Sequence, residues 1–301
     1  KYGRRTYVGG SMWGIEMAGI WQDVYLFAFS KVHVDDIFIK PDVTNGKLNI
    51  ELDLVNHTDK KVSLTINGEI RKWYNRAGLT INEVPEQKGE LAKSPSFIFP
   101  ALKKVTIEPN STQKITLTTT VTNQLEYWTP ETPELYGAVI QLAEGKETID
   151  TKYERFGWRE FKIAGDKLLL NGKPINLKGD SWHFTGVPQM TRRYAWAWFT
   201  MLKDVNANAV RFHAQPVTRF YMDLADEMGS CVLSETGIWS SDGGPKIDSE
   251  AYWESCVEHI KRLIKRDKNH ASIFGWSVCN ETVPVAVHVF KAPEELVQRQ
   301  L

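Results

Sequence analysis

The sequence predicts a multidomain fold of β plus α/β type, in which an immunoglobulin-like β-sandwich precedes the first half of a (β/α)8 TIM barrel. Apolar and polar residues alternate with a period of two from residue 32 to residue 150. Short apolar runs then alternate with helical patterns, giving four β/α repeats between residues 174 and 301. A closed barrel has eight repeats and roughly 250 residues, so about half of one is expected here.

The sandwich is predicted from strictly alternating runs. The run at 47–56, KLNIELDLVN, has polar residues on one face and four aliphatic residues on the other, which are Leu48, Ile50, Leu52 and Leu54. Turn signals recur between such runs, at Asn45-Gly46, Asn67-Gly68 and Glu144-Gly145. Strands with this spacing are typical of a half-buried antiparallel sandwich of roughly 100 residues.

The α/β part is predicted to begin at residue 151. A hairpin turning at Asn171-Gly172 is followed by a short strand, and alternating elements come next. They are a helix over 192–204, a strand over 207–212, a helix over 217–228, a strand over 231–235, a helix over 249–267 and a strand over 272–278. This order implies right-handed βαβ units and a parallel sheet. An open doubly wound sheet is the alternative, and the lack of GxGxxG after the first strand disfavours it.

The composition disfavours several classes of binding partner and cofactor. Lys plus Arg and Asp plus Glu both number 37, so the zero net charge provides no long-range field for nucleic acid or an anionic membrane. No apolar stretch approaches the roughly 20 residues of a membrane span. The three cysteines, Cys231, Cys256 and Cys279, are too scattered for a disulfide framework, and no zinc spacing is present. We expect no metal, no cofactor, no nucleic acid and no membrane. The compartment is left open, with a periplasmic or secreted location slightly favoured.

Ionisable, amide or aromatic residues follow each expected parallel strand. Ligands of β/α folds bind at the carboxyl ends of the strands, so these residues are predicted to share one rim. They are His183, Arg211, His213, Glu235, Trp239, Asn280 and Glu281.

Several of them also have a purely structural explanation. Arg211 and Glu235 fit an ion pair, Glu235 also fits a strand-end carboxylate that accepts backbone N–H groups, and His183 fits a hydrogen-bonded loop histidine. Glu281 directly follows the apolar run SIFGWSVCN, where a charge calls for a functional reason. Apolar neighbours such as Trp276 would raise the pKa of a carboxyl group there, as a general acid near neutral pH requires.

Five segments in order resemble glycoside hydrolase family 2. GWSVCNE at 275–281, preceded by RDKNHASIF, is similar to the family signature hPSiixWSlgNE, whose Glu is the acid/base. The other four are GIWQDVYL at 19–26, YWTPETPELY at 127–136, FGWREFKI with LLLNGKPINLKG over 156–179, and FYMDLADEMGSCVLSE at 220–235.

The resemblance implies three domains and a reaction. Residues 1–31 would be the tail of a jelly-roll sugar-binding domain, 32–150 the sandwich, and 151–301 the N-terminal half of the barrel. It implies a retaining β-glycosidase, most commonly labelled β-galactosidase, that removes non-reducing-end β-linked sugars from oligo- or polysaccharides. Glu281 would be the acid/base and Asn280 would hold the sugar's 2-hydroxyl. The subsite would be lined by His183, Arg211, His213, Glu235 and Trp239.

The resemblance also implies that the nucleophile, a Glu on a later strand, is absent from residues 1–301. The 301-residue piece alone is therefore expected to be inactive, and it could self-associate through exposed barrel edges. Two departures leave the sugar open between galactoside, glucuronide and mannoside: GDSWHFTG replaces GvNrHe, and VRFHAQP replaces vRtsHyP. A non-catalytic carbohydrate-binding protein is the alternative class. An α/β hydrolase is disfavoured because no GxSxG is present.

Overall fold

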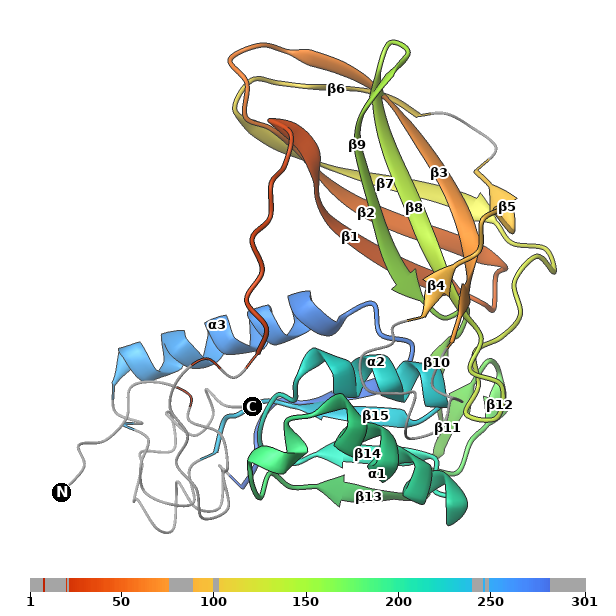
Figure 1. Ribbon diagram of the computed structural model, residues 1–301, viewed down its shortest axis with the longest axis vertical. Helices are drawn as coiled ribbons and strands as arrows, with labels where there is room; N and C mark the ends of the chain where they lie inside the picture. The colour runs from red at the N-terminus through yellow and green to blue at the C-terminus, as the bar shows by residue number, and fades with distance from the viewer. Residues whose placement is uncertain are drawn as a thin grey trace.

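The computed structural model describes residues 22–75, 89–99, 103–239 and 249–281, together with the single residues 8, 20 and 246. Most of the expected jelly-roll tail and everything after residue 281 lie outside the described residues. Figure 1 shows a β-sandwich (β1 to β9) standing on an α/β body (β13 to β16 with its helices), with the strands β10 to β12 at the junction. The predicted fold class is confirmed for the described residues.

The sandwich consists of two antiparallel sheets. One has the order β1-β2-β7, and the other has β4-β3-β8-β9 with β5 and β6 also paired to β3. The strands are β1 Val32–Asp42, β2 Lys47–Asn56, β3 Val62–Tyr74, β4 Glu90–Leu91, β5 Phe97–Ile98, β6 Lys103–Ile107, β7 Ser111–Thr120, β8 Leu135–Glu144 and β9 Glu147–Phe156. Strand β9 runs past residue 150, the boundary expected from the sequence, and keeps its pairing with β8 to Phe156.

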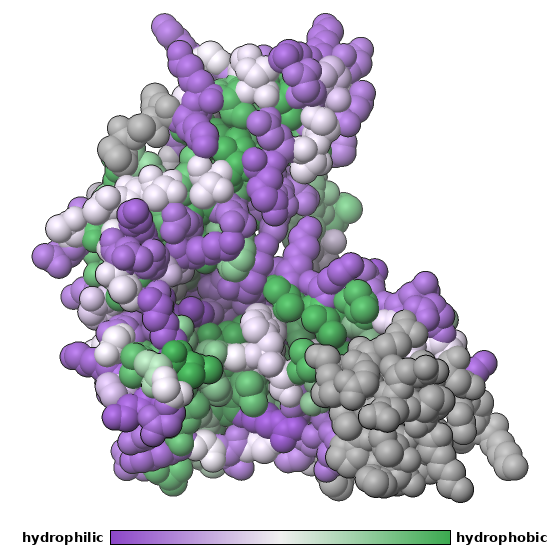
Figure 2. Space-filling view, turned by 180° about the vertical axis from the view of Figure 1, so that it is seen from behind, coloured by the Kyte–Doolittle hydropathy of each residue, from purple (hydrophilic) through white to green (hydrophobic). Residues whose placement is uncertain are grey.

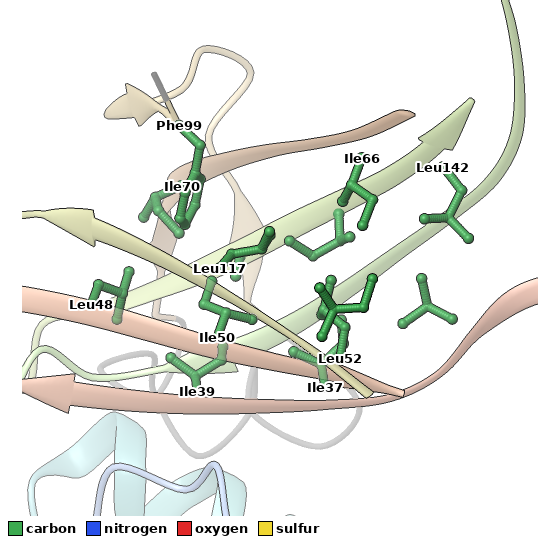
Figure 3. Close-up of a cluster of buried hydrophobic side chains, with 14 of the residues drawn as sticks. Ile37, Ile39, Leu48, Ile50, Leu52, Ile66, Ile70, Phe99, Leu117 and Leu142 are labelled. Atoms are coloured by element: carbon green, nitrogen blue, oxygen red, sulfur yellow. The ribbon is translucent and has the colours of Figure 1, made fainter. Parts of the chain in front are cut away.

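The alternating residues of the sequence form the sandwich core. Leu48, Ile50, Leu52 and Leu54 are all fully buried. Figure 3 shows Ile39 and Ile50 from one sheet facing Ile66 and Ile70 from the other. Burial of each such side chain stabilises the fold by about 1.5–3 kcal/mol. Hydrophilic residues dominate the outer surface of the sandwich, and more hydrophobic surface is visible over the α/β body (Figure 2).

One predicted turn is wrong. Strand β3 runs straight through Asn67-Gly68, whereas Gly46 and Gly145 do occupy turns with φ of 61° and 62°. Gly68 is needed for a different reason, because a Cβ there would lie 2.8 Å from the ring of Phe99. The backbone N–H of Phe99 also donates to the Gly68 carbonyl at 2.9 Å. A glycine inside a strand pattern therefore marks a close approach here.

The α/β body follows the predicted order closely. Its elements are β10 Phe161–Ala164, β11 Lys167–Leu170, β12 Lys173–Pro174, β13 Gly179–Trp182, the 3-10 helix η1 Val187–Gln189, α1 Arg192–Asp204, β14 Ala209–Phe212, α2 Arg219–Met228, β15 Cys231–Glu235, α3 Glu250–Asp267 and β16 Ile273–Ser277. The hairpin of β10 and β11 is extended by β12 after the predicted turn, where Asn171 and Gly172 have φ of 53° and 77°.

The parallel sheet has the order β13-β14-β15-β16, as in half a barrel, and within the described residues β13 and β16 form its edges. Helices α1 and α2 pack on one face of this sheet, over Trp182, Val210, Phe212 and Val232. Residues that alternate with these, Arg211 and Glu235 among them, therefore point to the opposite face, which becomes the interior of a barrel. None of the described helices is long and apolar enough to cross a bilayer.

The sandwich docks at the amino ends of the parallel strands. Trp128, fully buried, donates from Nε1 to the backbone oxygen of Asp226 at 2.8 Å. Arg155 of β9 pairs with three carboxylates near the end of α2, which are Asp223, Asp226 and Glu227. The loop before β16 also contacts the sandwich, because Asn269 accepts from the backbone N–H of Ile39 at 2.9 Å and donates to the carbonyl of Ile37 at 2.8 Å.

Candidate active site

The carboxyl ends of β14 and β15 are joined by a bidentate ion pair. Arg211 donates from Nε to Oε2 of Glu235 at 2.9 Å and from Nη2 to Oε1 at 2.8 Å. The two strands are neighbours in parallel register, so residues near their ends face one another. The side chain of Glu235 is only 1% exposed, whereas that of Arg211 is 36% exposed. The ion pair that was the structural explanation for these two residues is therefore present.

Glu235 is the centre of a wider hydrogen-bond network. Its Oε2 also accepts from Oγ of Ser277 on β16 at 2.6 Å, and its Oε1 accepts from the backbone N–H of Ala214 at 2.5 Å. A buried carboxylate is tolerated only when charge and hydrogen bonds compensate for lost hydration, and here four donors do so. Glu235 thus connects the carboxyl ends of β14, β15 and β16 through its hydrogen bonds.

Asn280 is oriented by the same arginine. Nη2 of Arg211 donates to Oδ1 of Asn280 at 2.7 Å, and the backbone N–H of Asn280 donates to the carbonyl of Ile238 at 3.0 Å. The side chain is buried, and its Nδ2 has no hydrogen-bond partner among the described residues. A buried donor without a partner calls for an explanation, and a ligand hydroxyl supplies one.

Glu281 follows Asn280 in a left-handed conformation. Its φ is 48° and its side chain is exposed in the described structure. Non-glycine residues in this region are uncommon, and such backbone strain clusters at functional sites. Trp276, the apolar neighbour expected beside Glu281, packs against the cluster under α1 and α2.

His183 and His213 lie side by side after β13 and β14. Their ring centroids are 4.4 Å apart, and the backbone N–H of His213 donates to the carbonyl of Trp182 at 3.0 Å. Burial lowers the pKa of His213, and the charges of His183 and Arg211 lower it further, while the carboxylates of Glu235 and Glu281 act in the opposite direction. The lowered pKa favours the neutral form of the His213 ring.

Trp239 completes the set predicted from the sequence. Its backbone forms an isolated parallel bridge with Asn280, and its side chain is half-buried. The structure thus brings Arg211, Glu235 and Asn280 into direct contact, with His213, Glu281 and Trp239 around them. His183 joins this group through His213.

Two residues of the site were missed from the sequence. Ser277 is a polar residue inside an apolar strand, and that irregularity was an available signal. Gln189 has no such signal, yet its amide shapes the loop after β13, donating to the carbonyl of His183 at 2.9 Å and accepting from the N–H groups of Thr185 and Gly186. Within the described ranges, no group of three or more His, Cys, Asp or Glu residues is arranged to hold a metal ion.

Family models match both parts of the chain. One described as the TIM barrel domain of glycosyl hydrolases family 2 matches residues 161–298, and one described as glycosyl hydrolases family 2 matches residues 32–159.

Curated relatives carry the names of glycosidases. The chain is 30% identical over 284 residues to a β-galactosidase of Streptococcus thermophilus, covering 88% of this chain and 25% of that protein. It is 34% identical over 172 residues to a putative β-glucuronidase of Formosa agariphila, covering 56% and 16%. The chain spans about a quarter of the length of the β-galactosidases that it matches.

Solved structures share the fold. A β-glucuronidase of Bacteroides uniformis matches with a TM-score of 0.68 and 24% identity, covering 89% of this chain and 31% of that one. A β-galacturonidase of Eisenbergiella tayi matches with a TM-score of 0.68 and 20% identity, covering 90% and 45%. The sandwich, the half barrel and the two matching family models together establish that this chain belongs to glycosyl hydrolases family 2.

Proposed function

We propose that the full-length protein is a retaining β-glycosidase with Glu281 as its acid/base. The observation that carries the proposal is the pair at the end of β16. Asn280 is fixed through Oδ1 by Arg211 with its Nδ2 unpartnered among the described residues, and the exposed carboxyl of Glu281 follows it directly. An oriented hydroxyl-binding donor next to an accessible carboxyl suits general acid catalysis on a glycoside.

In the proposed mechanism, Glu281 protonates the glycosidic oxygen while a second carboxylate attacks the anomeric carbon. Water activated by Glu281 then releases the sugar from the covalent intermediate. Retention requires the two carboxyl groups about 5–5.5 Å apart. The second carboxylate is proposed to come from outside residues 1–301, so the 301-residue chain alone is expected to give no turnover. The edge strands of the described parallel sheet, β13 and β16, are also proposed to favour self-association.

The remaining rim residues are proposed to hold the sugar. Nδ2 of Asn280 would donate to the 2-hydroxyl, a bond that strengthens in the transition state. The rings of His183 and His213 would contact outer hydroxyls, and Trp239 would offer an aromatic face. Glu235 would act by keeping Arg211 and Asn280 in place.

A β-galactoside is the proposed substrate class, supported by the names of the relatives that span most of this chain. A β-glucuronide is the second candidate, because the similar protein of Formosa agariphila carries that name at 34% identity. A β-mannoside is retained as a third, since the two departures at the rim fall where outer hydroxyls bind.

The test compares kcat/KM of the full-length Glu281→Gln variant with that of the unchanged full-length protein on two glycosides that differ in their leaving group. General acid catalysis typically contributes 10²–10⁴-fold, so an alkyl glycoside should lose about that much in kcat/KM. A dinitrophenyl glycoside, whose leaving group needs little protonation, should lose far less. Equal losses on both substrates would contradict an acid/base role.

A control variant and a sugar panel complete the design. Glu258→Gln makes the same chemical change on the exposed face of α3, where Glu258 pairs with Arg262, and it should leave both rates unchanged. Aryl β-galactosides, β-glucuronides and β-mannosides would identify the sugar. Sugar binding without turnover of any of them would favour a non-catalytic carbohydrate-binding protein instead.

A further inference from the structure

Strand β16 contains one extra residue relative to its neighbour β15. Val232 lies opposite Ile273 and Leu233 lies opposite Gly275, so Phe274 has no partner on β15. Such a bulge re-aims the residues that follow it, because side chains alternate between the two faces of a sheet. A slip of one residue after Phe274 would turn every following side chain to the other face.

The residues after this bulge are those of the candidate site. Glu235 pairs with Ser277 in the sheet, and Oγ of Ser277 reaches Oε2 of Glu235 at 2.6 Å. Three residues further on, Asn280 meets Arg211. If Phe274 instead lay opposite Leu233 in a regular register, Ser277 would point toward the helices and Asn280 would leave its partner. The bulge thus decides which side chains of this strand reach the rim.

The bulge is held from outside the sheet by Arg159, which lies between the sandwich and the hairpin of β10 and β11. Its Nε donates to the carbonyl of Ala271 at 2.8 Å, and its Nη2 donates to the carbonyls of His270 and Ile273 at 3.1 Å each. Ile273 is the residue immediately before Phe274. A planar guanidinium can hold three carbonyls in one fixed arrangement, which a lysine ammonium on a flexible stem cannot.

Phe161 supports both Arg159 and the bulge. Its ring centroid lies 5.2 Å from the guanidinium carbon of Arg159 and 6.1 Å from the ring centroid of Phe274. Burial lowers the pKa of Arg159 to about 10, which reflects the cost of keeping this cation away from water. A costly buried cation that binds backbone carbonyls is consistent with a role in fixing local geometry.

We propose that Arg159, supported by Phe161, is a positioning residue for the acid/base strand: it fixes the bulge at Phe274 and thereby the aim of Ser277, Asn280 and Glu281. The catalytic consequence rests on the proposed function of Glu281, whereas the structural coupling does not. Arg159 lies at the amino end of β16 and Glu281 beyond its carboxyl end, so Arg159 acts through the strand and not on substrate.

The first arm of the test does not depend on enzymatic activity. Hydrogen exchange is measured on the chain with Arg159→Lys, which keeps the charge and loses the planar fork, and with Phe161→Leu as a milder variant. Lys203→Met is the matched control, because Lys203 also donates to backbone carbonyls at the same junction, those of Pro130 and Met228, away from β16. We expect exchange over residues 273–280 to rise at least about tenfold in both test variants and to stay unchanged in the control.

The second arm uses the full-length protein and the ratio of kcat/KM for alkyl and dinitrophenyl glycosides. Loss of folded protein lowers both rates equally, whereas a misplaced acid penalises the alkyl glycoside alone, so the ratio should fall about tenfold in Arg159→Lys and not in Lys203→Met. Unchanged exchange over 273–280 in both test variants, or an equal rise in the control, overturns the proposal. A full-length protein without turnover would count against the proposed function only, and the exchange result would still decide the coupling.

Discussion

Arg211 donates from Nη2 to Oδ1 of Asn280 at 2.7 Å while its Nε and Nη2 hold both oxygens of Glu235. One guanidinium thereby joins the ends of β14 and β15 to the residue that precedes Glu281. Because the guanidinium is planar and rigid, it fixes the orientation of the Asn280 amide as well as its position. The donor Nδ2 of Asn280 is left without a hydrogen-bond partner among the described residues.

Replacing Arg211 by Met should destabilise the chain by about 3 kcal/mol, because the buried carboxylate of Glu235 loses its counter-ion. The free energy of unfolding in urea measures this loss. In the double variant Arg211→Met with Glu235→Gln, the total loss should be smaller than the sum of the single losses, since no uncompensated charge remains. Additivity within about 0.5 kcal/mol would mean that the two residues are not coupled.

The role proposed for Asn280 is tested by removing both ends of its hydrogen bond. Asn280→Ala in the full-length protein should lower kcat/KM on a normal glycoside by about 10- to 100-fold, the cost of a bond that strengthens in the transition state. On the matching 2-deoxy glycoside the variant and the unchanged protein should perform alike. A loss of similar size on both substrates would show that Nδ2 does not contact the 2-hydroxyl.

His270 should make stability depend on pH. Burial acts to lower the pKa of His270, but the carboxylates of Asp226, 2.7 Å from Nδ1, and of Asp267 and Asp223 together outweigh burial and raise the pKa to about 8. A pKa above the unfolded value of about 6.5 adds stability that is complete below pH 6.5 and is lost as the pH rises through 8. Urea unfolding should therefore show a loss of about 1–2 kcal/mol between pH 6 and pH 9.

His270→Gln is the variant that isolates this contribution. It should lower stability at pH 6 and flatten the dependence between pH 6 and pH 9, because the titrating group is gone. A slope that is unchanged in His270→Gln would assign the effect to another group.

Gly229 should be more sensitive to substitution than Gly145. Both have left-handed backbone, with φ of 72° and 62°, so alanine at either costs about 1–2 kcal/mol in backbone strain. A Cβ at Gly229 would also lie 2.3 Å from the backbone oxygen of Pro130, whereas one at Gly145 meets nothing within 4 Å. Gly229→Ala should therefore lower the urea midpoint clearly more than Gly145→Ala. Equal shifts would mean that the contact with Pro130 carries no strain.

Local pattern was enough to predict the order and type of the elements. The alternation of Leu48, Ile50 and Leu52 identifies a strand with one buried face, whatever lies across the core. Helix α1 was predicted with the bounds it has, Arg192–Asp204, from helical periodicity alone. Parallel β/α order also implied that Arg211, Glu235 and Asn280 would share one rim, because the carboxyl ends of parallel strands meet at one edge.

Contacts between residues distant in sequence were decided only by the tertiary structure. Periodicity tells which face of a strand is buried, but it does not tell which carbonyl a side chain more than a hundred residues away will meet, as for Arg159 and Ala271. The same holds for Gly68. Its sequence context predicted a turn, but in the structure Gly68 lies within a strand and packs closely against Phe99. The bulge at Phe274 is likewise invisible in the sequence, because register is a relation between two strands and is set by what packs against both.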